Sequence, residues 1–295
     1  MDYYKKIKEE LINNEVNRKV KNYSINRSDL TTYYNVGKML AQAGKHYGEG
    51  IIKAYSIKLT NEIGKGYTFT SLTRMKKFYL LIKKLATLSQ HLSYGHYVEL
   101  LPYDDINKIN YYIDITEKQS LSIRQLRERI KSNEYERLPE TTKRKLITDG
   151  ERKADDLVKN PILIRNRNSI TEVSEKVLQK LILENIPSFL DELGIGFTFI
   201  KNEYKIKIGN TYNYIDLLLF NIEFNCYVVV ELKVTELKKE HIGQIEVYMN
   251  YIDNNLRKIN QDKTIGIILT KKDNKYIIEY CSDKRIISRE YELVK

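Results

Sequence analysis

Three ionisable residues interrupt two strongly apolar segments in the second half of the chain. Asp216 lies within Tyr214–Phe220, and Glu231 and Lys233 lie within Val228–Val234. Because successive side chains of a strand alternate between its two faces, Glu231 and Lys233 share one face. Burying an unpaired carboxylate in such a strand costs on the order of several kcal/mol. A cation shared by Asp216 and Glu231 would offset that cost.

The available donor atoms favour a hard cation at these carboxylates. Mg²⁺ binds one or two carboxylates together with substrate phosphate and water, whereas zinc prefers Cys and His clusters, whose spacing Cys226 and Cys281 do not have. We therefore expect Mg²⁺, with Mn²⁺ as a substitute, at Asp216 and Glu231. The ion would activate a water molecule that attacks a phosphodiester, and Lys233 would orient or deprotonate that water. The competing interpretation is a salt-bridged trio that only holds neighbouring strands together.

Apolar patterns predict the elements that position these residues. We expect strands over residues 197–200, 204–208, 212–220, 227–234 and 264–270, with a helix over 240–256 between the last two. A further helix is expected ahead of the strands, because Ser169 and Glu172 have capping-box spacing and helical apolar spacing continues to Gly194. Pro187 would kink this helix. The pattern predicts an α/β fold around a mixed sheet.

The first half of the chain is predicted to be helical, because apolar residues recur there at spacings of three and four. Periodicity fades near Pro139 and Pro161. We therefore expect an α+β protein with a helical, basic domain over 1–140, a linker over 141–168 and an α/β domain over 169–295.

Positive charge is concentrated in the first half. The net charge is +11, and residues 1–160 hold 30 basic and 20 acidic residues against 20 and 19 in residues 161–295. Residues 63–98 contain no Asp or Glu. This stretch is a candidate phosphate-binding surface, although a solvated helix face would also explain it. The candidate nucleic-acid-binding residues are Lys65, Arg74, Lys76 and Lys77.

Hydropathy argues against a membrane protein. No apolar run approaches the ~18 residues that span a bilayer, and the first residues are charged rather than apolar. We therefore expect no membrane partner and a cytoplasmic location.

Several short motifs together resemble a known family. They are Phe189–Phe197, Tyr214–Phe220, Cys226–Lys233, His241–Gln244 with Tyr248, and Ile265–Leu269. This series resembles the YhcG-like family of PD-(D/E)XK nucleases, with Ile215 in place of the proline before the aspartate. The first half resembles that family's N-terminal domain of unknown function in Tyr33–Gly37, Phe69–Met75, Phe78–Tyr79, Leu92–Tyr97 and Tyr135–Leu138.

The resemblance implies a restriction-endonuclease-like fold and a role for each site residue. It implies that Asp216 and Glu231 bind the metal, that Lys233 is the catalytic lysine and that Gln244 supports the site. Members of the fold also commonly use an acid from the first helix. Here Gln179 occupies one of two positions where the family tends to have an acid, and it brings no charge to a cation. Glu184 is our first candidate for the helix acid, and Glu175 is the second.

Two histidines have structural and functional interpretations. We favour a structural role for His96, because His91 and Glu99 nearby complete no ligand set. His241 precedes Gln244 by about one helical turn and would contact phosphate in one interpretation. In the other, it is simply a residue at a helix start.

Our leading hypothesis is therefore a two-domain, Mg²⁺-dependent nuclease. The N-terminal domain would bind nucleic acid, with DNA as the expected form, and the C-terminal domain would cut the backbone. One alternative is a non-catalytic nucleic-acid-binding or complex-assembly protein that retains the nuclease fold. Another is an N-terminal half that binds protein. A homodimer is one candidate assembly.

Overall fold

The computed structural model describes residues 2–19, 25–48, 50–85, 88–89, 91–148, 156, 158–167, 169–281 and 283–295. The chain divides into two compact units, residues 1–135 and 136–295. Within the described residues, no helix is both long enough and apolar enough to cross a membrane.

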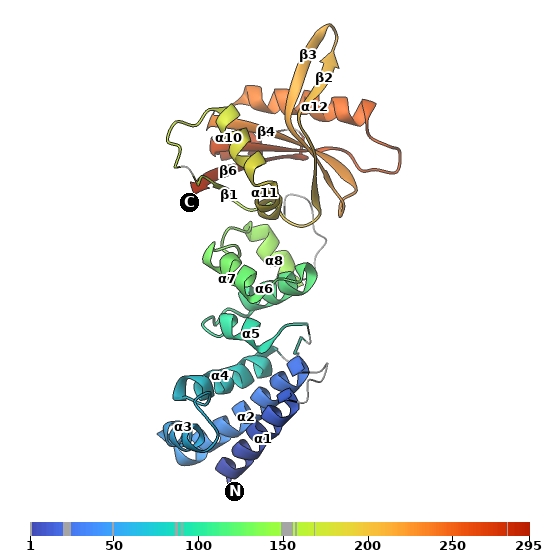
Figure 1. The fold of residues 1–295 in the computed structure, drawn as a ribbon. Coiled ribbons are helices and arrows are strands. Elements are labelled where there is room, and N and C mark those ends of the chain that lie inside the picture. Colours follow the sequence, from blue (N-terminus) through green and yellow to red (C-terminus); the bar gives the residue numbers. More distant parts are fainter. Residues whose placement is uncertain are drawn as a thin grey trace. The chain divides into compact units, whose positions relative to one another are not determined.

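The first unit is helical, as the sequence predicts. Its helices are α1 (Tyr3–Lys19), α2 (Ile25–Tyr47), α3 (Gly50–Glu62), α4 (Phe69–Leu85), α5 (Tyr94–Leu100), α6 (Ile106–Gln119) and α7 (Ile123–Lys131) (Figure 1). Helices α2 and α4 cross closely at Gly37, where an added Cβ would lie 2.1 Å from the backbone oxygen of Met75. Only glycine permits this approach of two backbones.

Aromatic side chains join α2, α4 and α5 in this unit. The rings of Tyr33 and Tyr94 lie 4.5 Å apart between centroids, and Phe78 contacts both Tyr94 and Tyr97. His96 has the expected structural role. Its Nδ1 accepts from the Ser93 backbone N–H at 3.0 Å, and its Nε2 lies 3.0 Å from the carbonyl oxygen of Leu121.

The second unit is a mixed sheet with helices on both faces. Its elements are α8 (Glu140–Thr148), β1 (Ile162–Arg165), α10 (Glu175–Glu184), α11 (Ile186–Leu193), β2 (Phe197–Ile208), β3 (Thr211–Asn221), β4 (Cys226–Glu236), α12 (Lys239–Asn255), β5 (Ile265–Lys272), α13 (Lys275–Glu279) and β6 (Ile286–Val294). The strand order is β1-β6-β5-β4-β3-β2. The pairs β1–β6, β6–β5 and β5–β4 are parallel, and β3 is antiparallel to both β4 and β2. The predicted fold class is confirmed.

Helices cover both faces of the sheet (Figure 1), and a hydrophobic cluster lies against each face. Leu178 and Phe189 of α10 and α11 pack with Val230 on one face. Ile245 and Met249 of α12 pack on the other face in a second cluster. Strand β4 is buried on both sides, which explains its nearly continuous apolar sequence.

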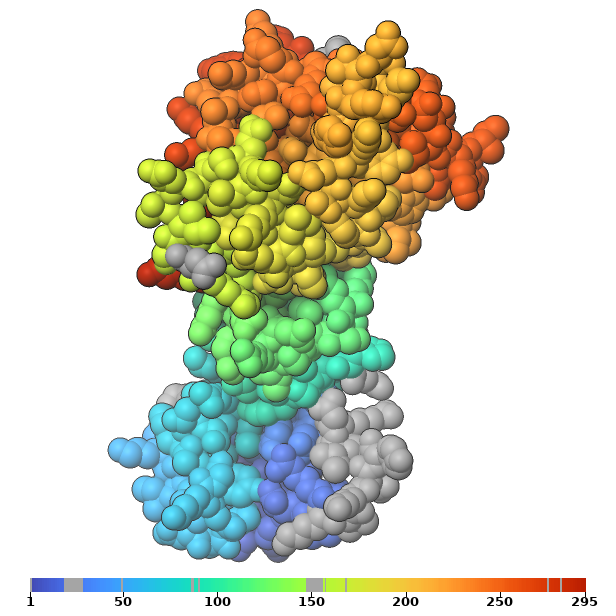
Figure 2. Space-filling model, turned by 45° about the horizontal axis from the view of Figure 1, so that its top comes forward, coloured from blue at the N-terminus to red at the C-terminus, as the bar shows by residue number. Residues whose placement is uncertain are grey.

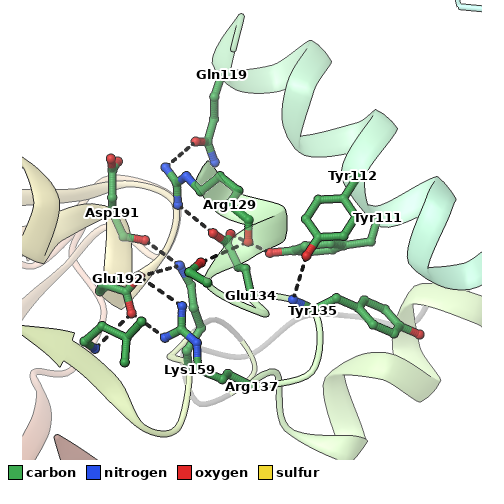
Figure 3. Close-up of polar contacts among 12 residues, drawn as sticks. Tyr111, Tyr112, Gln119, Arg129, Glu134, Tyr135, Arg137, Lys159, Asp191 and Glu192 are labelled. Carbon is green, nitrogen blue, oxygen red and sulfur yellow. Dashed lines mark hydrogen bonds and ion pairs between the residues drawn. The ribbon is translucent and has the colours of Figure 1, made fainter. Parts of the chain in front are cut away.

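The segment predicted to be a linker, 141–168, contains regular structure. It includes most of α8 and the whole of β1, which pairs in parallel with β6. A buried ionic cluster fixes this region within the second unit (Figure 3). Arg137 binds the carboxylate of Glu192 through both terminal nitrogens, and the Leu163 backbone N–H donates to the same carboxylate at 3.0 Å. Lys159 donates to the backbone oxygen of Asp191 at 2.7 Å.

The helix predicted from Ser169 begins later and consists of two helices. Ser169 has a left-handed backbone with φ of 51°, which excludes it from a helix start. Ser174 is the N-cap of α10, and its hydroxyl accepts from the Val177 backbone N–H. Asn185 separates α10 from α11 and caps the second helix, near whose start Pro187 is well tolerated.

Candidate active site

Asp216, Glu231 and Lys233 come together on β3 and β4 as the sequence predicts. The paired residues Leu217 and Val230 place Asp216 beside Glu231 in the antiparallel ladder. Lys233 Nζ lies 3.4 Å from Glu231 Oε2. Asp216 Oδ2 accepts a hydrogen bond from the Leu232 backbone N–H at 2.8 Å, so the two strands are also joined through this carboxylate.

Glu231 is a buried acid with incomplete pairing. Its side chain is 2% exposed, and Oε1 has no hydrogen-bond partner among the described residues. Burial and the negative charge of Asp216 raise the pKa of Glu231 to about 8, although Lys233 acts in the opposite direction. Burial also raises the pKa of Asp216. The charged form of this pair therefore requires more positive charge than Lys233 supplies.

Helix α10 contributes Glu175 and Gln179 to the site. Glu175 Oε1 lies 3.9 Å from Lys233 Nζ, and Gln179 Nε2 donates to the backbone oxygen of Asp216 at 3.0 Å. Glu184 is exposed at the other end of α10. Glu184 follows Glu175 by nine positions, about two and a half helical turns, so the two side chains point to opposite sides of α10 and lie roughly 13 Å apart along its axis. The structure thus brings Glu175 to the site and not Glu184.

Sequence reasoning did not anticipate the role of Gln179. Its amide is a hydrogen-bond donor that an ionised acid at this position would lack, and it holds the backbone at Asp216. The sequence-based prediction also did not include Thr270. This residue pairs with Lys233 in the ladder, and its buried hydroxyl has no partner among the described residues.

Helix α12 carries the two remaining candidates. Gln244 is partly buried, and its Nε2 donates to the Tyr248 hydroxyl at 3.1 Å. His241 accepts from the Lys238 backbone N–H at 3.2 Å, as a helix-start residue does. Burial lowers the pKa of His241, and the positive charges of Lys233 and Lys238 lower it further. The charge of Lys233 in the site therefore acts on the His241 ring.

The donor set fits a cation held by two carboxylates. The described part of the chain contains no cluster of three or more His, Cys, Asp or Glu side chains suited to a metal. Asp216 and Glu231 would supply two oxygen donors, and substrate phosphate and water would complete the shell of Mg²⁺. Oε1 of Glu231, which no described residue contacts by a hydrogen bond, is suited to be one such donor.

The basic candidates of the first unit occupy different surroundings. Lys65 and Arg74 line a pocket of about 590 Å³ together with Tyr33, Tyr67 and Tyr94. Lys77 is exposed one turn beyond Arg74 on α4. Lys76 is half-buried and points about 160° away from Arg74 around the helix. Arg74 and Lys77 therefore lie on the same side of α4, and Lys65 lines the same pocket as Arg74. Lys76 lies on the other side of the helix.

The fold and the paired carboxylates beside a lysine define a restriction-endonuclease-like nuclease domain. Residues 155–294 match the family model of the YhcG PDDEXK nuclease domain, and residues 7–137 match that of the DUF1016 N-terminal domain. The predicted resemblance is confirmed: the chain is a member of the YhcG-like family of PD-(D/E)XK nucleases.

Individual relatives are distant. The chain is 22% identical to the Escherichia coli (strain K12) protein named Putative nuclease YhcG, over 83% of this chain and 77% of that protein. It is 19% identical to a repair endonuclease from Pyrococcus abyssi, with a TM-score of 0.29 over 43% of this chain and 49% of that one. The EndoMS-dsDNA2 complex gives 20% identity and a TM-score of 0.30 over 44% and 48%. The chain thus spans about half the length of these two solved structures.

Proposed function

We propose that the protein is a metal-dependent nuclease that hydrolyses phosphodiester bonds in DNA. The observation that carries this proposal is the buried Oε1 of Glu231 beside Asp216, which has no partner in the described part of the chain, in a domain of the PD-(D/E)XK family. A purely structural trio would satisfy both oxygens of a buried carboxylate. One oxygen left without a partner is instead suited to bind a cation.

Asp216 and Glu231 would hold Mg²⁺, or Mn²⁺ in its place. When bound, the ion lowers the pKa of its water and neutralises charge on the phosphoryl group. The Leu232 N–H fixes one oxygen of Asp216, and Gln179 fixes the backbone that carries it. These contacts hold the carboxylates in place before substrate arrives.

Lys233 is the cation that the chain itself supplies at the reacting phosphate. Its ammonium is nearly buried and is shared between Glu231 at 3.4 Å and Glu175 at 3.9 Å. In this low-dielectric setting it would stabilise charge on the phosphoryl oxygens and orient the attacking water. Glu175 would keep the ammonium directed toward the site, which makes it the helix acid of our proposal.

The first unit would hold the phosphate backbone. Lys65, Arg74 and Lys77 are exposed cations around a pocket or on the neighbouring turn of α4. The tyrosines of that pocket offer rings on which bases stack. Affinity would then come mainly from the first unit, and chemistry from the second.

The proposal is tested with the full chain and a panel of labelled duplex, single-stranded, branched and RNA substrates, each with Mg²⁺ or with chelator. We expect cleavage of DNA that requires the metal. Salt-sensitive binding without any metal-dependent cleavage would contradict the proposal and would support a non-catalytic binding protein.

A further inference from the structure

Strands β2 and β3 form a two-stranded arm that extends past the rest of the sheet. The pairing of β3 with β4 begins at Leu217, whereas its pairing with β2 continues to Thr211 and Ile208. The strands run out together beside α12 in Figure 1, and the amber hairpin lies at the surface in Figure 2. We call residues 202–215 the β-arm.

The register of the β-arm places its tyrosines in line with the catalytic aspartate. Lys205 pairs with Tyr214, and Lys207 pairs with Tyr212. Side chains two residues apart share a strand face, so Tyr212 and Tyr214 lie on the same side of β3, and Asp216 follows Tyr214 by two residues on the same strand. Each step along the strand is about 6.6 Å. The arm therefore joins the site along β3, with Tyr214 two residues from Asp216.

The opposite face anchors the β-arm. Ile206 and Ile215 are buried in the hydrophobic cluster beneath α12, together with the partly buried Tyr204. This contact accounts for the stability of a hairpin that would be marginal alone. It does not account for the other face, where Tyr212 and Tyr214 are each 53% exposed.

The exposed face has the chemistry of a single-strand platform. Lys205 Nζ lies 3.8 Å from the ring centroid of Tyr212 and Lys207 Nζ lies 6.0 Å from it, and neither lysine is paired with a carboxylate among the described residues. Aromatic rings that alternate with cations bind unpaired nucleotides, because bases stack on the rings while phosphates meet the ammonium groups. Bases within a duplex are already stacked and do not offer a free face.

We propose that the β-arm binds an unpaired nucleic-acid strand next to the bond that is cut. The inference rests on the proposed nuclease function and specifies its substrate: nucleic acid with a single-stranded segment beside the cleaved phosphodiester. Tyr212 and Tyr214 stack on bases, and Lys205 and Lys207 contact the flanking phosphates.

The test compares Tyr212→Ala/Tyr214→Ala with wild type on single-stranded and fully duplex DNA. Equilibrium binding is measured by fluorescence anisotropy in chelator, and kcat and KM are measured with Mg²⁺. We expect Kd and KM for single-stranded DNA to rise about tenfold or more, while kcat changes by less than about twofold. Duplex binding should be nearly unaffected.

Matched variants separate stacking from folding and from charge. Tyr212→Phe/Tyr214→Phe keeps the rings and should restore wild-type affinity. Tyr276→Ala/Tyr280→Ala removes a similarly exposed pair, 74% and 81% exposed, at α13 and should have no effect. Lys205→Gln/Lys207→Gln should flatten the dependence of log Kd on log salt by about 1.4 for single strands.

Each result bears on one of the two proposals. If the alanine variant binds and cuts single strands like wild type, or loses only duplex binding, the β-arm proposal is overturned. Wild type that binds single strands through the arm but never cuts supports the arm and contradicts the nuclease proposal. Wild type that neither binds nor cuts nucleic acid overturns both.

Discussion

At the scale of single residues, Glu231 sets the character of the site. It is buried, lies beside a second carboxylate and leaves one oxygen unpartnered within the described structure. Such a group destabilises the metal-free fold whenever it is ionised. In the nuclease that we propose, this loss of stability in the metal-free protein keeps the two acids ready for a cation.

This cost gives a prediction for the stability of the metal-free protein. In the folded protein, burial and Asp216 raise the pKa of Glu231 to about 8. The folded state is therefore stabilised by keeping this carboxyl protonated. That stabilisation is complete below the unfolded pKa of roughly 4.3 and is lost as pH rises through about 8. Glu231→Gln should therefore be more stable than wild type at pH 8.5 in chelator, by on the order of a few kcal/mol. The difference should shrink toward pH 5.

Denaturant unfolding at the two pH values measures this difference, with the exposed Glu223→Gln as the control variant. Saturating Mg²⁺ should stabilise wild type and not Glu231→Gln. A stability gain that is independent of pH would contradict the account.

The helix acid offers a second prediction at this scale. Glu175→Gln removes the charge that holds Lys233 at 3.9 Å, and we expect the cleavage rate to fall about 10–100-fold. Glu184→Gln is a matched control on the same helix and should cut within about twofold of wild type. Rate measurements on the two variants decide between them. A greater loss of cleavage rate in Glu184→Gln than in Glu175→Gln would indicate that Glu184 is the helix acid, as the sequence predicts.

At the scale of elements, α11 and β1 depend on the carboxylate of Glu192. It accepts from Arg137 and from the Leu163 backbone, and Lys159 lies 3.9 Å away (Figure 3). All these groups are nearly buried, so removal of the acid takes away a negative charge that compensates Arg137 and Lys159.

Glu192→Gln should accordingly destabilise the second unit by about 3–5 kcal/mol. Glu140→Gln breaks an ion pair with Lys143 in which the acid is 77% exposed, and it should destabilise the second unit far less than Glu192→Gln does. Thermal unfolding measures both. Equal effects would show that the buried cluster does not hold these elements together.

Some helices and strands can be predicted from the sequence and others cannot. Strands β3, β4 and β5 and helix α12 are predicted within a few residues, because their apolar patterns are strong. Strand β2 is predicted as two strands because the polar residues 201–203 interrupt the apolar pattern, whereas the structure continues one strand through them, with a bulge between Phe199 and Lys201. Strand β1 has only four residues, beside Pro161, and forms through its pairing with the distant β6. A local pattern cannot reveal such a partner.

The sequence likewise predicts some residues of the candidate site and not others. The spacing of Asp216, Glu231 and Lys233 was sufficient to predict their meeting on adjacent strands. The choice between Glu175 and Glu184 depends on where α10 begins and how it is rotated against the sheet. The misplaced start at Ser169 left that rotation undetermined.

At the scale of the whole molecule, charge is divided between the two halves. Residues 1–160 carry a net charge of 30 − 20 = +10, whereas residues 161–295 carry 20 − 19 = +1. We expect the first half to supply most of the salt-dependent affinity for nucleic acid.

Lys65→Gln/Arg74→Gln tests this division. If both cations contact duplex phosphates, the slope of log Kd against log salt should fall by about 1.8. Cleavage at saturating DNA should stay near the wild-type rate. Lys258→Gln/Lys263→Gln makes the same charge change in the second unit. An equal loss of slope in this control would show that only net charge matters, and an unchanged affinity in the first variant would favour a protein-binding N-terminal half.

In the nuclease that we propose, Asp216, Glu231 and Lys233 form a metal-dependent catalytic site. Its most direct test is the single-turnover rate of DNA cleavage in Mg²⁺ for Asp216→Asn and Lys233→Met, with Glu223→Gln as the control and with folding and DNA binding verified for each. We predict that both site variants bind DNA like wild type and cut at least about a hundredfold more slowly, whereas the control cuts at the wild-type rate. A folded Asp216→Asn or Lys233→Met protein that cuts as fast as wild type would contradict the account.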